Sequence, residues 1–443
     1  MNESLNFENS ASFAASLDEA DELRRFRRQF SIPEKDGKHV LYFTGNSLGL
    51  MPDRARKMVE EELRKWGAYG VDGHFEGQRP WFTYHELSKE GLASLTGSKP
   101  AEVVAMNNLT SNLHLMMVSF FRPDKKRFKI IMEAGAFPSD QYAVESQLRF
   151  HGLDPNKALI EIQPREGEFI LREEDIIETI ERNGKETALV LLSGVQYFTG
   201  QKFNLGAITE AAHKAGALAG FDLAHAIGNV ELNLHDDEVD FAVWCTYKYL
   251  NSGPGSVSGV FVHERHGDNP DIPRFAGWWG HDQDSRFMMK KGFIPMHGAD
   301  GWQLSNVNVL GTAGHIASLQ VFADAGWKRL LQKAKLLHAY LRFLLEDISS
   351  IYPAYSIITP ADDDQHGCQV SLHFPKQGRQ IFRFLSENGV VADWREDNLV
   401  SDQQAERPGV VRIAPVPLYN SFRDIYQFSV LLRKGLEKYH EEV

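Results

Sequence analysis

The chain of 443 residues is poor in several features that define broad classes of protein. Its two cysteines, Cys245 and Cys368, are too few for a disulfide framework or a cysteine-based zinc site. No apolar run approaches the ~18 residues of a membrane-spanning helix. The first 16 residues are polar and acidic, unlike a secretory signal. We therefore expect a cytoplasmic protein with no metal and no membrane partner.

The chain also lacks an excess of basic residues. Its formal net charge is -12, which argues against a nucleic-acid partner because such a partner favours a basic face. The content of 42% hydrophobic and 24% charged residues is ordinary for a folded soluble protein. The length predicts two to three domains, and the sequence contains no internal repeat, low-complexity tract or linker.

What the chain does have is a regular alternation of predicted strands and helices between about residues 100 and 265. This alternation is typical of an α/β fold with a doubly wound, mostly parallel sheet. The fully apolar run 188–192 predicts a central strand, buried on both faces. The predicted strands cover residues 103–106, 129–132, 158–162, 188–192, 217–221, 241–245 and 257–262.

The two ends of the chain predict a second, smaller α/β domain. Strands are expected over 368–374, 390–394 and 409–413, with helices between and after them. Near the N-terminus, amphipathic patterns predict helices over 11–30, 53–66 and 84–95. We expect the N-terminal segment to pack with the C-terminal part. The predicted domains are 76–319 for the large one, and 1–75 with 320–443 for the small one.

Several chemically useful side chains follow the predicted strands, at the sheet edge where α/β proteins bind ligands. Lys248 stands out because it lies between two buried strands and ahead of a glycine-rich loop, 253–255. A lysine at a strand end can extend to water. If it is buried instead, desolvation lowers its pKa and makes its amine a nucleophile. The residues at this edge are Thr110, Phe137, Ser193, Asp222, His225 and Lys248.

These residues together favour a pyridoxal phosphate (PLP) site. The cofactor needs a Schiff-base lysine, which Lys248 can supply, and an acid for its ring nitrogen, which Asp222 can supply. Thr110 with the start of the following helix suits the phosphate, and Phe137 can stack on the ring. His225, three residues after Asp222, can line the same pocket. Each residue alone also has a plain structural explanation, as a cap or a hydrogen-bonded core group.

The chain resembles the kynureninase family, PLP enzymes of the aspartate aminotransferase fold type I, from about residue 40 to 425. The strings around Lys248 and at 277–281 are the most specific, whereas Asp222 and Lys248 occur throughout the fold type. The motifs are YFTGNSLG (42–49), GHFEGQRPW (73–81), NLT (108–110), FPSD (137–140), LSGVQYFTGQ (192–201), DLAHAIGN (222–229), WCTYKYLN (244–251), GWWGH (277–281) and RIAPVPLYN (412–420).

The resemblance implies roles for individual residues. Lys248 would attach the cofactor and move the substrate α-proton, and Tyr247 is the candidate acid for the β-carbanion. Arg412 would bind the substrate carboxylate, with His74, Ser305 and Asn306 near the aryl group. Trp279 departs from the aromatic that relatives carry at that place, so Trp278 is the residue carried over. The implied cofactor-binding residues are Leu109, Thr110, Phe137, Pro138, Ser139, Asp140, Ser193, Asp222, His225, Tyr247, Lys248, Trp278 and Asn306.

The implied reaction is hydrolysis of L-kynurenine, or its 3-hydroxy form, to anthranilate or 3-hydroxyanthranilate and L-alanine. Such an enzyme serves tryptophan degradation or pyridine nucleotide biosynthesis. Its partners would be an amino-acid substrate and a second copy of the chain in a homodimer. A cysteine desulfurase or an aminotransferase of the same fold type is the alternative. The sequence does not rank the two substrates, because one ring hydroxyl depends on pocket shape.

Overall fold

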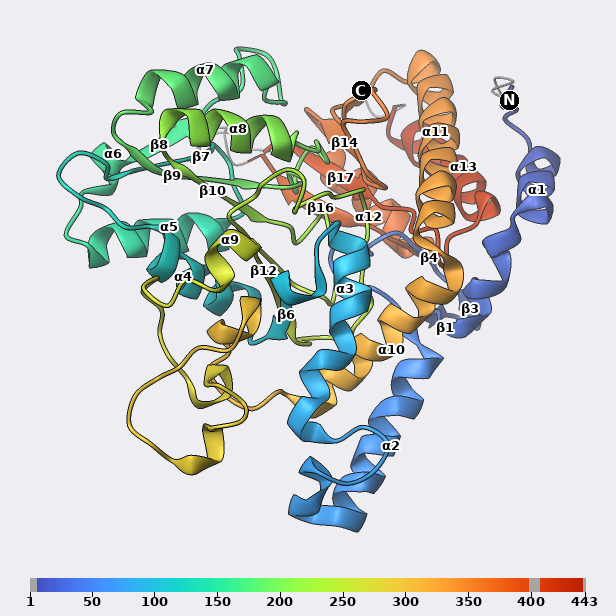
Figure 1. Ribbon diagram of the computed structural model, residues 1–443. Coiled ribbons are helices and arrows are strands. Elements are labelled where there is room, and N and C mark those ends of the chain that lie inside the picture. Colours follow the sequence, from blue (N-terminus) through green and yellow to red (C-terminus); the bar gives the residue numbers. More distant parts are fainter. Residues whose placement is uncertain (1–5, 398–406, 441–443) are drawn as a thin grey trace. The chain divides into compact units, whose positions relative to one another are not determined.

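The computed structural model describes residues 6–397 and 407–440 and divides into two compact units (Figure 1). Unit 1 comprises residues 1–53, 198–201 and 323–443, and unit 2 comprises 54–197 and 202–322. The outermost parts of the predicted small domain, together with residues 398–406, lie outside the described residues. Each unit has its own buried core.

Unit 2 is built on a seven-stranded sheet in the order β6-β12-β11-β10-β9-β7-β8. Strands β11, β10, β9, β7 and β8 run parallel, and β12 pairs antiparallel with both β11 and β6. The predicted, mostly parallel sheet is confirmed, and the apolar run 188–192 lies inside it as expected. The strands are β6 (Val103–Met106), β7 (Lys129–Glu133), β8 (Leu159–Ile162), β9 (Thr187–Ser193), β10 (Leu218–Asp222), β11 (Phe241–Trp244) and β12 (Ser258–Val262).

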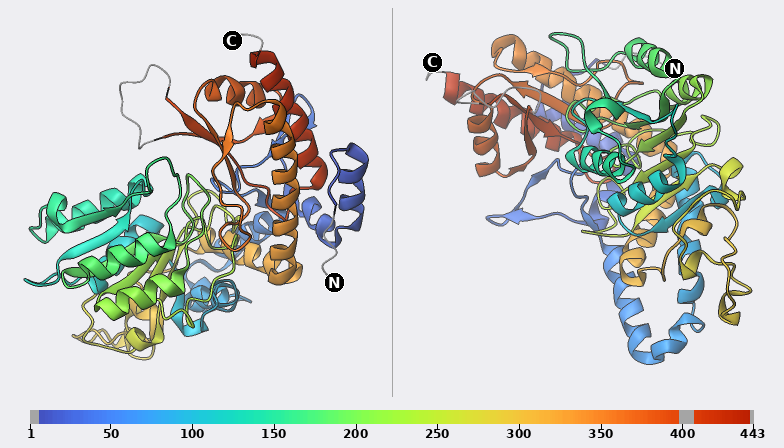
Figure 2. Two further views of the ribbon diagram at one scale, coloured as in Figure 1. Left: turned by 90° about the horizontal axis from the view of Figure 1, so that it is seen from above. Right: turned by 90° about the vertical axis from the view of Figure 1, so that its left-hand side faces the viewer.

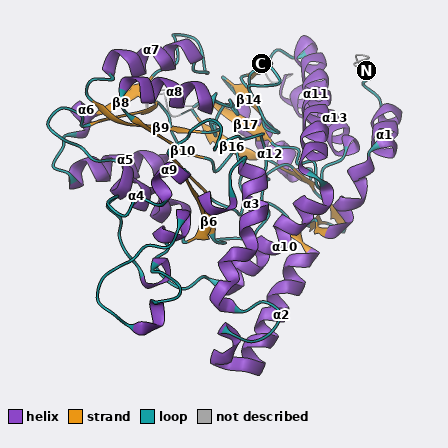
Figure 3. Cartoon of the chain, viewed as in Figure 1, coloured by secondary structure: helices purple, strands orange, loops and turns teal. Residues whose placement is uncertain are grey.

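Helices cover both faces of this sheet, as Figures 1 and 3 show. Helices α7 (Glu173–Asn183) and α8 (Leu205–Ala215) pack on one face, and α4 (Leu109–Phe120) and α5 (Pro138–Phe150) pack on the other. Gly216 ends α8 with φ 79°, a left-handed conformation that glycine adopts without steric cost. The apolar faces of α4 and α5 and the sheet share one hydrophobic cluster.

Further helices of unit 2 surround this sheet. The predicted helix 84–95 is two elements, η3 (Trp81–Ser88) and α3 (Lys89–Thr96). Helix α2 (Asp53–Tyr69) packs its Met58 in a cluster with Trp81, Tyr84 and Ala317. The remaining helical elements are η2 (Gly70–His74), η4 (Pro100–Glu102), α6 (Pro155–Ala158), α9 (Glu264–Gly267), η5 (Trp278–Gly280), η6 (Arg286–Met288), η7 (Gly298–Trp302) and α10 (Val309–Ala325).

Unit 1 contains a four-stranded sheet in the order β13-β14-β17-β16, which is antiparallel throughout. Helices α11 (Trp327–Ile351) and α13 (Phe422–His440) lie side by side next to it, in orange and red in Figure 2. Its other elements are β1 (Phe30–Ser31), β2 (Glu34–Lys35), β3 (Lys38–His39), β4 (Leu41–Tyr42), β5 (Met51–Pro52), β13 (Ser356–Ile357), β14 (Val370–Phe374), α12 (Gly378–Glu387), β15 (Val390–Val391), β16 (Asp393–Glu396) and β17 (Gly409–Ile413).

Two predicted elements of unit 1 are divided in the structure. The helix expected over 11–30 is α1 (Ala11–Ala20) followed by η1 (Glu22–Gln29). The break falls at Asp21, whose carboxylate accepts the N–H of Leu23 and so caps the second helix. The strand expected over 390–394 is divided because β15 pairs with β4 whereas β16 pairs with β17.

The N-terminal segment packs with the C-terminal part of the chain within unit 1. Ala14 of α1 and Phe43 share a buried cluster with residues of α11 and α13, such as Leu341 and Phe428. The compact units differ from the predicted domains mainly at α2, which belongs to unit 2, whereas the prediction assigned residues 1–75 to the small domain. The domain bounds themselves stay a prediction.

No helix in the part of the chain that the structure describes combines the length and apolar character needed to cross a membrane.

Candidate active site

Ten of the predicted site residues line one pocket of unit 2, at the carboxyl ends of the parallel strands. They come from loops and helix starts that are far apart in sequence and meet because parallel strands end at the same sheet edge. The ten residues are Leu109, Thr110, Phe137, Ser139, Asp140, Ser193, Asp222, His225, Tyr247 and Lys248.

Strand register places the acid and the hydroxyl of the pocket side by side. Asp222 ends β10 and is paired with Ser193, which ends β9, and with Val243 on β11. Lys248 follows four residues after the end of β11. The three strands are therefore the frame that brings the amine, the carboxyl and the hydroxyl to one place.

The amine of Lys248 has two close neighbours in the pocket. Its Nζ lies 2.9 Å from Nε2 of His225, in the turn after β10. It also lies 5.7 Å from the centroid of the Phe137 ring. Phe137 is 44% exposed and contacts Tyr197 edge to face, at 5.3 Å between ring centroids. An aromatic ring beside the amine suits a flat ligand that stacks on it.

Two carboxyl groups, those of Asp140 and Asp222, are buried in the same pocket. Burial, together with the charge of Asp222 and a hydrogen bond to it, raises the pKa of Asp140 well above its usual range. Burial also raises the pKa of Asp222, but the hydrogen bond from Asp140, the N–H of Ala224 and the nearby Lys248 all oppose this rise. Of the two groups, Asp140 therefore has the stronger preference for a proton, and Asp222 is the better stabilised in the ionised form that binds a cationic N–H.

The start of α4 faces the pocket through Leu109 and Thr110. The helix is capped by Asn108, whose side chain accepts the N–H of Ser111 at 3.0 Å, so Thr110 is inside the first turn rather than at the cap. The hydroxyl of Thr110 lies 2.9 Å from that of Ser139, in the first turn of α5. Two hydroxyls and two helix N-termini form a site suited to a phosphate group.

The acid proposed for the reaction, Tyr247, is next to Lys248 in sequence and lines the same pocket. Burial raises the pKa of Tyr247 far above its ordinary value of 10, and a hydrogen bond with Cys245 adds to this. The phenol therefore keeps its proton at neutral pH, as a proton donor must.

Other predicted residues are not part of the pocket lining. Pro138 is the first residue of α5, between two residues that do line it. Trp278 is 43% exposed and packs against Trp279 and Phe287. The others lie in loops of unit 2 or in unit 1: His74 in η2, Ser305 and Asn306 exposed ahead of α10, and Arg412 on β17 of unit 1.

Arg412 is buried in unit 1, with 2% of its surface exposed. It is paired in register with Asp393 on the neighbouring strand β16, and the two side chains form an ion pair. Arg395 makes a second ion pair with Asp393, at 2.6 Å. The guanidinium of Arg412 is thus held in one orientation by its carboxylate partner.

The pocket also contains residues that sequence reasoning missed. Glu133 is the most notable, because the predicted strand ended one residue earlier, at Met132. The signal was the one used for Asp222, a carboxyl group at the carboxyl end of a buried parallel strand. The other missed lining residues are Val195, Tyr197 and Ala224, which offered no distinctive pattern.

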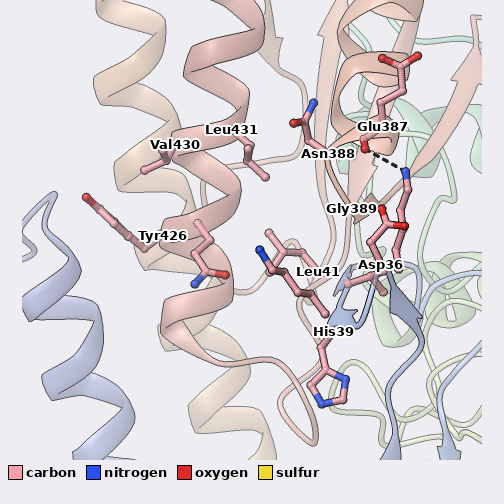
Figure 4. A pocket seen from close by; sticks show the side chains of 13 residues that line it. Asp36, His39, Leu41, Glu387, Asn388, Gly389, Tyr426, Val430 and Leu431 are labelled. Carbon is pink, nitrogen blue, oxygen red and sulfur yellow. Dashed lines mark hydrogen bonds between the residues drawn. The ribbon is translucent and has the colours of Figure 1, made fainter.

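Two further features outside this pocket have no catalytic arrangement. A pocket of unit 1, shown in Figure 4, is lined by the β2–β3 hairpin, and Lys35 there donates to the carbonyls of Ser386 and Glu387. In unit 2, Glu102, His235 and His263 lie close enough for a metal. However, Glu102 Oε1 already lies 2.9 Å from Nδ1 of His235 and accepts the N–H of Glu264.

Solved structures with the same fold include cysteine desulfurases. The enzyme from Thermococcus onnurineus NA1 has a TM-score of 0.72 at 19% identity and covers 90% of this chain and 95% of its own. A cysteine desulfurase of Escherichia coli has a TM-score of 0.73 at 15% identity and covers 95% and 99% of the two chains. At this level of identity the likeness concerns the fold, which agrees with the predicted PLP fold type I.

Sequence comparison is more specific. Residues 330–432 match the model of the kynureninase C-terminal domain. The kynureninase of Flavobacterium psychrophilum is 51% identical, over 97% of this chain and 99% of its own length. Those of Myxococcus xanthus and Xanthomonas campestris are 53% and 52% identical, over 95% and 94% of this chain and 96% of theirs. With half of its residues identical over nearly its whole length, the chain belongs to the kynureninase family.

Proposed function

We propose that the chain hydrolyses L-kynurenine or 3-hydroxy-L-kynurenine, or both, at the pocket around Lys248. The products are anthranilate or 3-hydroxyanthranilate, with L-alanine in either case. The observation that carries this proposal is the family membership of a chain whose amine, acid and aromatic ring meet in one pocket. The enzyme would act in tryptophan degradation or, through 3-hydroxyanthranilate, in pyridine nucleotide biosynthesis.

The cofactor is pyridoxal phosphate, and the pocket suits it. The buried carboxyl groups of Asp140 and Asp222 line the same pocket as the amine of Lys248, which is the set of acid and amine that the cofactor needs. Lys248 would attach the cofactor, Asp222 would bind its ring nitrogen, and Thr110 with Ser139 would bind its phosphate. When bound, the cofactor withdraws electrons from the carbon skeleton of an amino acid, which makes cleavage of the bond between β and γ carbons feasible.

The side chains of the pocket would divide the proton transfers between them. We assign removal of the substrate α-proton to Lys248, whose Nζ is held by His225 at 2.9 Å. Tyr247 would donate a proton to the β-carbon, because its phenol stays protonated at neutral pH. Arg412 would bind the substrate carboxylate in a bidentate fashion. His74, Ser305 and Asn306 would contact the aryl group, and Trp278 and Asn306 the cofactor.

The alternative of a cysteine desulfurase needs a reactive thiol. Both cysteines are buried, and burial raises the pKa of the Cys368 thiol to about 12 and also that of Cys245. Neither is therefore a thiolate at neutral pH, and neither lies on an exposed loop. The desulfurases are related to this chain at 15–19% identity, against about half for the kynureninases.

The decisive experiment is steady-state kinetics of the purified holoenzyme on both substrates. The aryl amine and L-alanine should appear in equal amounts, and neither should appear without the cofactor. The same preparation given L-cysteine should release no sulfide. Sulfide release without kynurenine turnover would instead favour the desulfurase.

We further propose that the chain forms a homodimer in the cytoplasm, with no nucleic-acid or membrane partner. Unit 2 exposes an apolar patch made of Phe75, Trp278 and Phe287, which contact one another through Phe287. Burying this patch against a second copy would favour association. It would also give a role to Trp278 and to His74, which lie outside the pocket lining of their own chain. Two free thiols agree with a reducing compartment.

A further inference from the structure

One buried acid of the pocket, Glu133, has no part in the proton transfers assigned above. It ends β7, is 2% exposed and lines the pocket together with Asp222 and Lys248. Burying a carboxyl group is costly unless it is hydrogen-bonded. Its partners therefore indicate what it does there.

Both partners of the Glu133 carboxyl group are supplied by Ser193. The Ser193 hydroxyl donates to Oε1 at 2.6 Å. The Ser193 N–H lies 3.2 Å from Oε1 and 3.3 Å from Oε2. A hydroxyl has one hydrogen and two lone pairs. While its hydrogen points at an ionised Glu133, the Ser193 oxygen can only accept hydrogen bonds from a ligand in the pocket.

Burial makes both protonation states of Glu133 accessible near neutral pH. Burial raises the pKa of Glu133 to about 7, against the opposing hydrogen bonds from Ser193 and with a further rise from the charge of Asp222. The other titratable groups that line the same pocket are Asp222 on β10, Asp140 on α5, Tyr197 after β9, His225 after β10, and Tyr247 and Lys248 after β11. When Glu133 takes a proton, its O–H can donate to Ser193, which frees the hydroxyl hydrogen to turn towards the ligand.

We propose that Glu133 is a positioning residue whose proton decides whether the Ser193 hydroxyl donates to, or accepts from, an oxygen of the bound cofactor. The change involves one proton taken up from solvent and two reoriented hydrogen bonds, and no other bond forms or breaks. The inference rests on the proposed function, because it needs the cofactor in this pocket. In this role Glu133 would act on the cofactor through the Ser193 hydroxyl.

The test is a pH titration of the absorbance of the bound cofactor in the resting holoenzyme, without substrate. The wild-type protein should show a midpoint near pH 7, because a donated hydrogen bond stabilises charge on the cofactor oxygen and alters its absorbance. Glu133→Gln keeps the side-chain volume but has no titratable proton, so this midpoint should be lost. Glu161→Gln, the same change on the exposed part of neighbouring β8, should retain it.

Ser193→Ala provides a second, independent test. It keeps the carboxyl group of Glu133 but removes the hydroxyl that carries the signal, so the same midpoint should be lost. If Glu133→Gln fails to fold, Ser193→Ala decides alone. A midpoint that persists unchanged in either variant, or that is absent from the wild type, overturns the inference.

The failure of the inference is distinct from failure of the proposed function. Suppose the wild-type protein binds the cofactor and turns over kynurenine, but Glu133→Gln leaves the near-neutral midpoint of the absorbance unchanged. That result would contradict the inference and leave the proposed function intact. If the wild-type holoenzyme cleaves neither substrate but shows the midpoint, and Glu133→Gln and Ser193→Ala both lose it, the proposed reaction is wrong and the role of Glu133 is supported.

Discussion

At the scale of single residues, the proposal depends most on Lys248. Its amine lies 2.9 Å from His225 and faces the pocket that holds Asp222. Lys248→Ala should lower kcat on kynurenine by about 1000-fold or more, because it removes both the attachment point and the base. Steady-state assays of aryl amine release check this. Lys214→Ala, at an exposed ion pair on α8, is the matched control and should keep wild-type activity. Wild-type turnover by Lys248→Ala would end the assignment.

Arg412 allows an equally sharp comparison, because two arginines share one carboxylate. Both Arg412 and Arg395 pair with Asp393, but only Arg412 is proposed to bind substrate. Arg412→Gln should raise KM for kynurenine by roughly 10- to 100-fold, because it removes a charged hydrogen bond to the substrate carboxylate. Arg395→Gln should leave KM within about twofold, with circular dichroism as the check that both variants fold. Equal effects of the two changes would mean that Arg412 acts only through the sheet.

At the scale of elements, one buried carboxylate ties the helical layer to the sheet in unit 2. Asp240 accepts the N–H of Ala219 on β10 at 2.7 Å. It also pairs with His213 of α8, and with Arg265 and His266 of α9, at 2.7–2.9 Å. Asp240→Asn should lower the free energy of unfolding by about 3 kcal/mol, because it leaves these donors without a charged partner. Urea denaturation at pH 7 measures this, with Asp175→Asn in an exposed pair as the control.

The same carboxylate predicts a pH dependence. Burial raises the pKa of Asp240, but the hydrogen bonds from His213, His266, Ala219 and Arg265 outweigh it and hold the pKa below the ordinary 3.8. A depressed pKa means that the unfolded state binds the proton more tightly. The stabilisation is therefore complete above about pH 4 and is lost as the pH falls further. Below pH 4, wild-type stability should fall more steeply than that of Asp240→Asn. Parallel curves would contradict this.

At the scale of the whole molecule, the exposed patch of Phe75, Trp278 and Phe287 predicts association. We expect sedimentation at about twice the chain mass of 50.2 kDa. Phe287→Asp should shift the protein to the monomer, because a carboxylate in an apolar interface must lose its hydration. Phe150→Asp, which changes a phenylalanine that is 77% exposed elsewhere on unit 2, should not. A monomeric wild type, or a dimer unaffected by Phe287→Asp, would contradict the proposed interface.

Much of this molecule could be predicted from its sequence because the signals are local. Apolar runs with flanking turns defined the strands of unit 2 to within one or two residues, and the fully apolar run 188–192 revealed its interior place. Ends of elements were less predictable. The break at Asp21 depends on one side chain that caps a new helix, and the division of 390–394 depends on which strands pair.

The sequence by itself determined the fold type and the cofactor and predicted Lys248 as the central residue, because these rest on local motifs and on residue types at fixed places along strands. Only the tertiary structure decided which side chains surround Lys248. Strand register and burial together produce three features of the pocket. They are the position of His225 beside the amine, the proton shared by Asp140 and Asp222, and the hydrogen bond from Ser193 to Glu133. Register and burial set the distances between residues far apart in the chain, and through them the pKa values of those residues, which no local sequence pattern encodes.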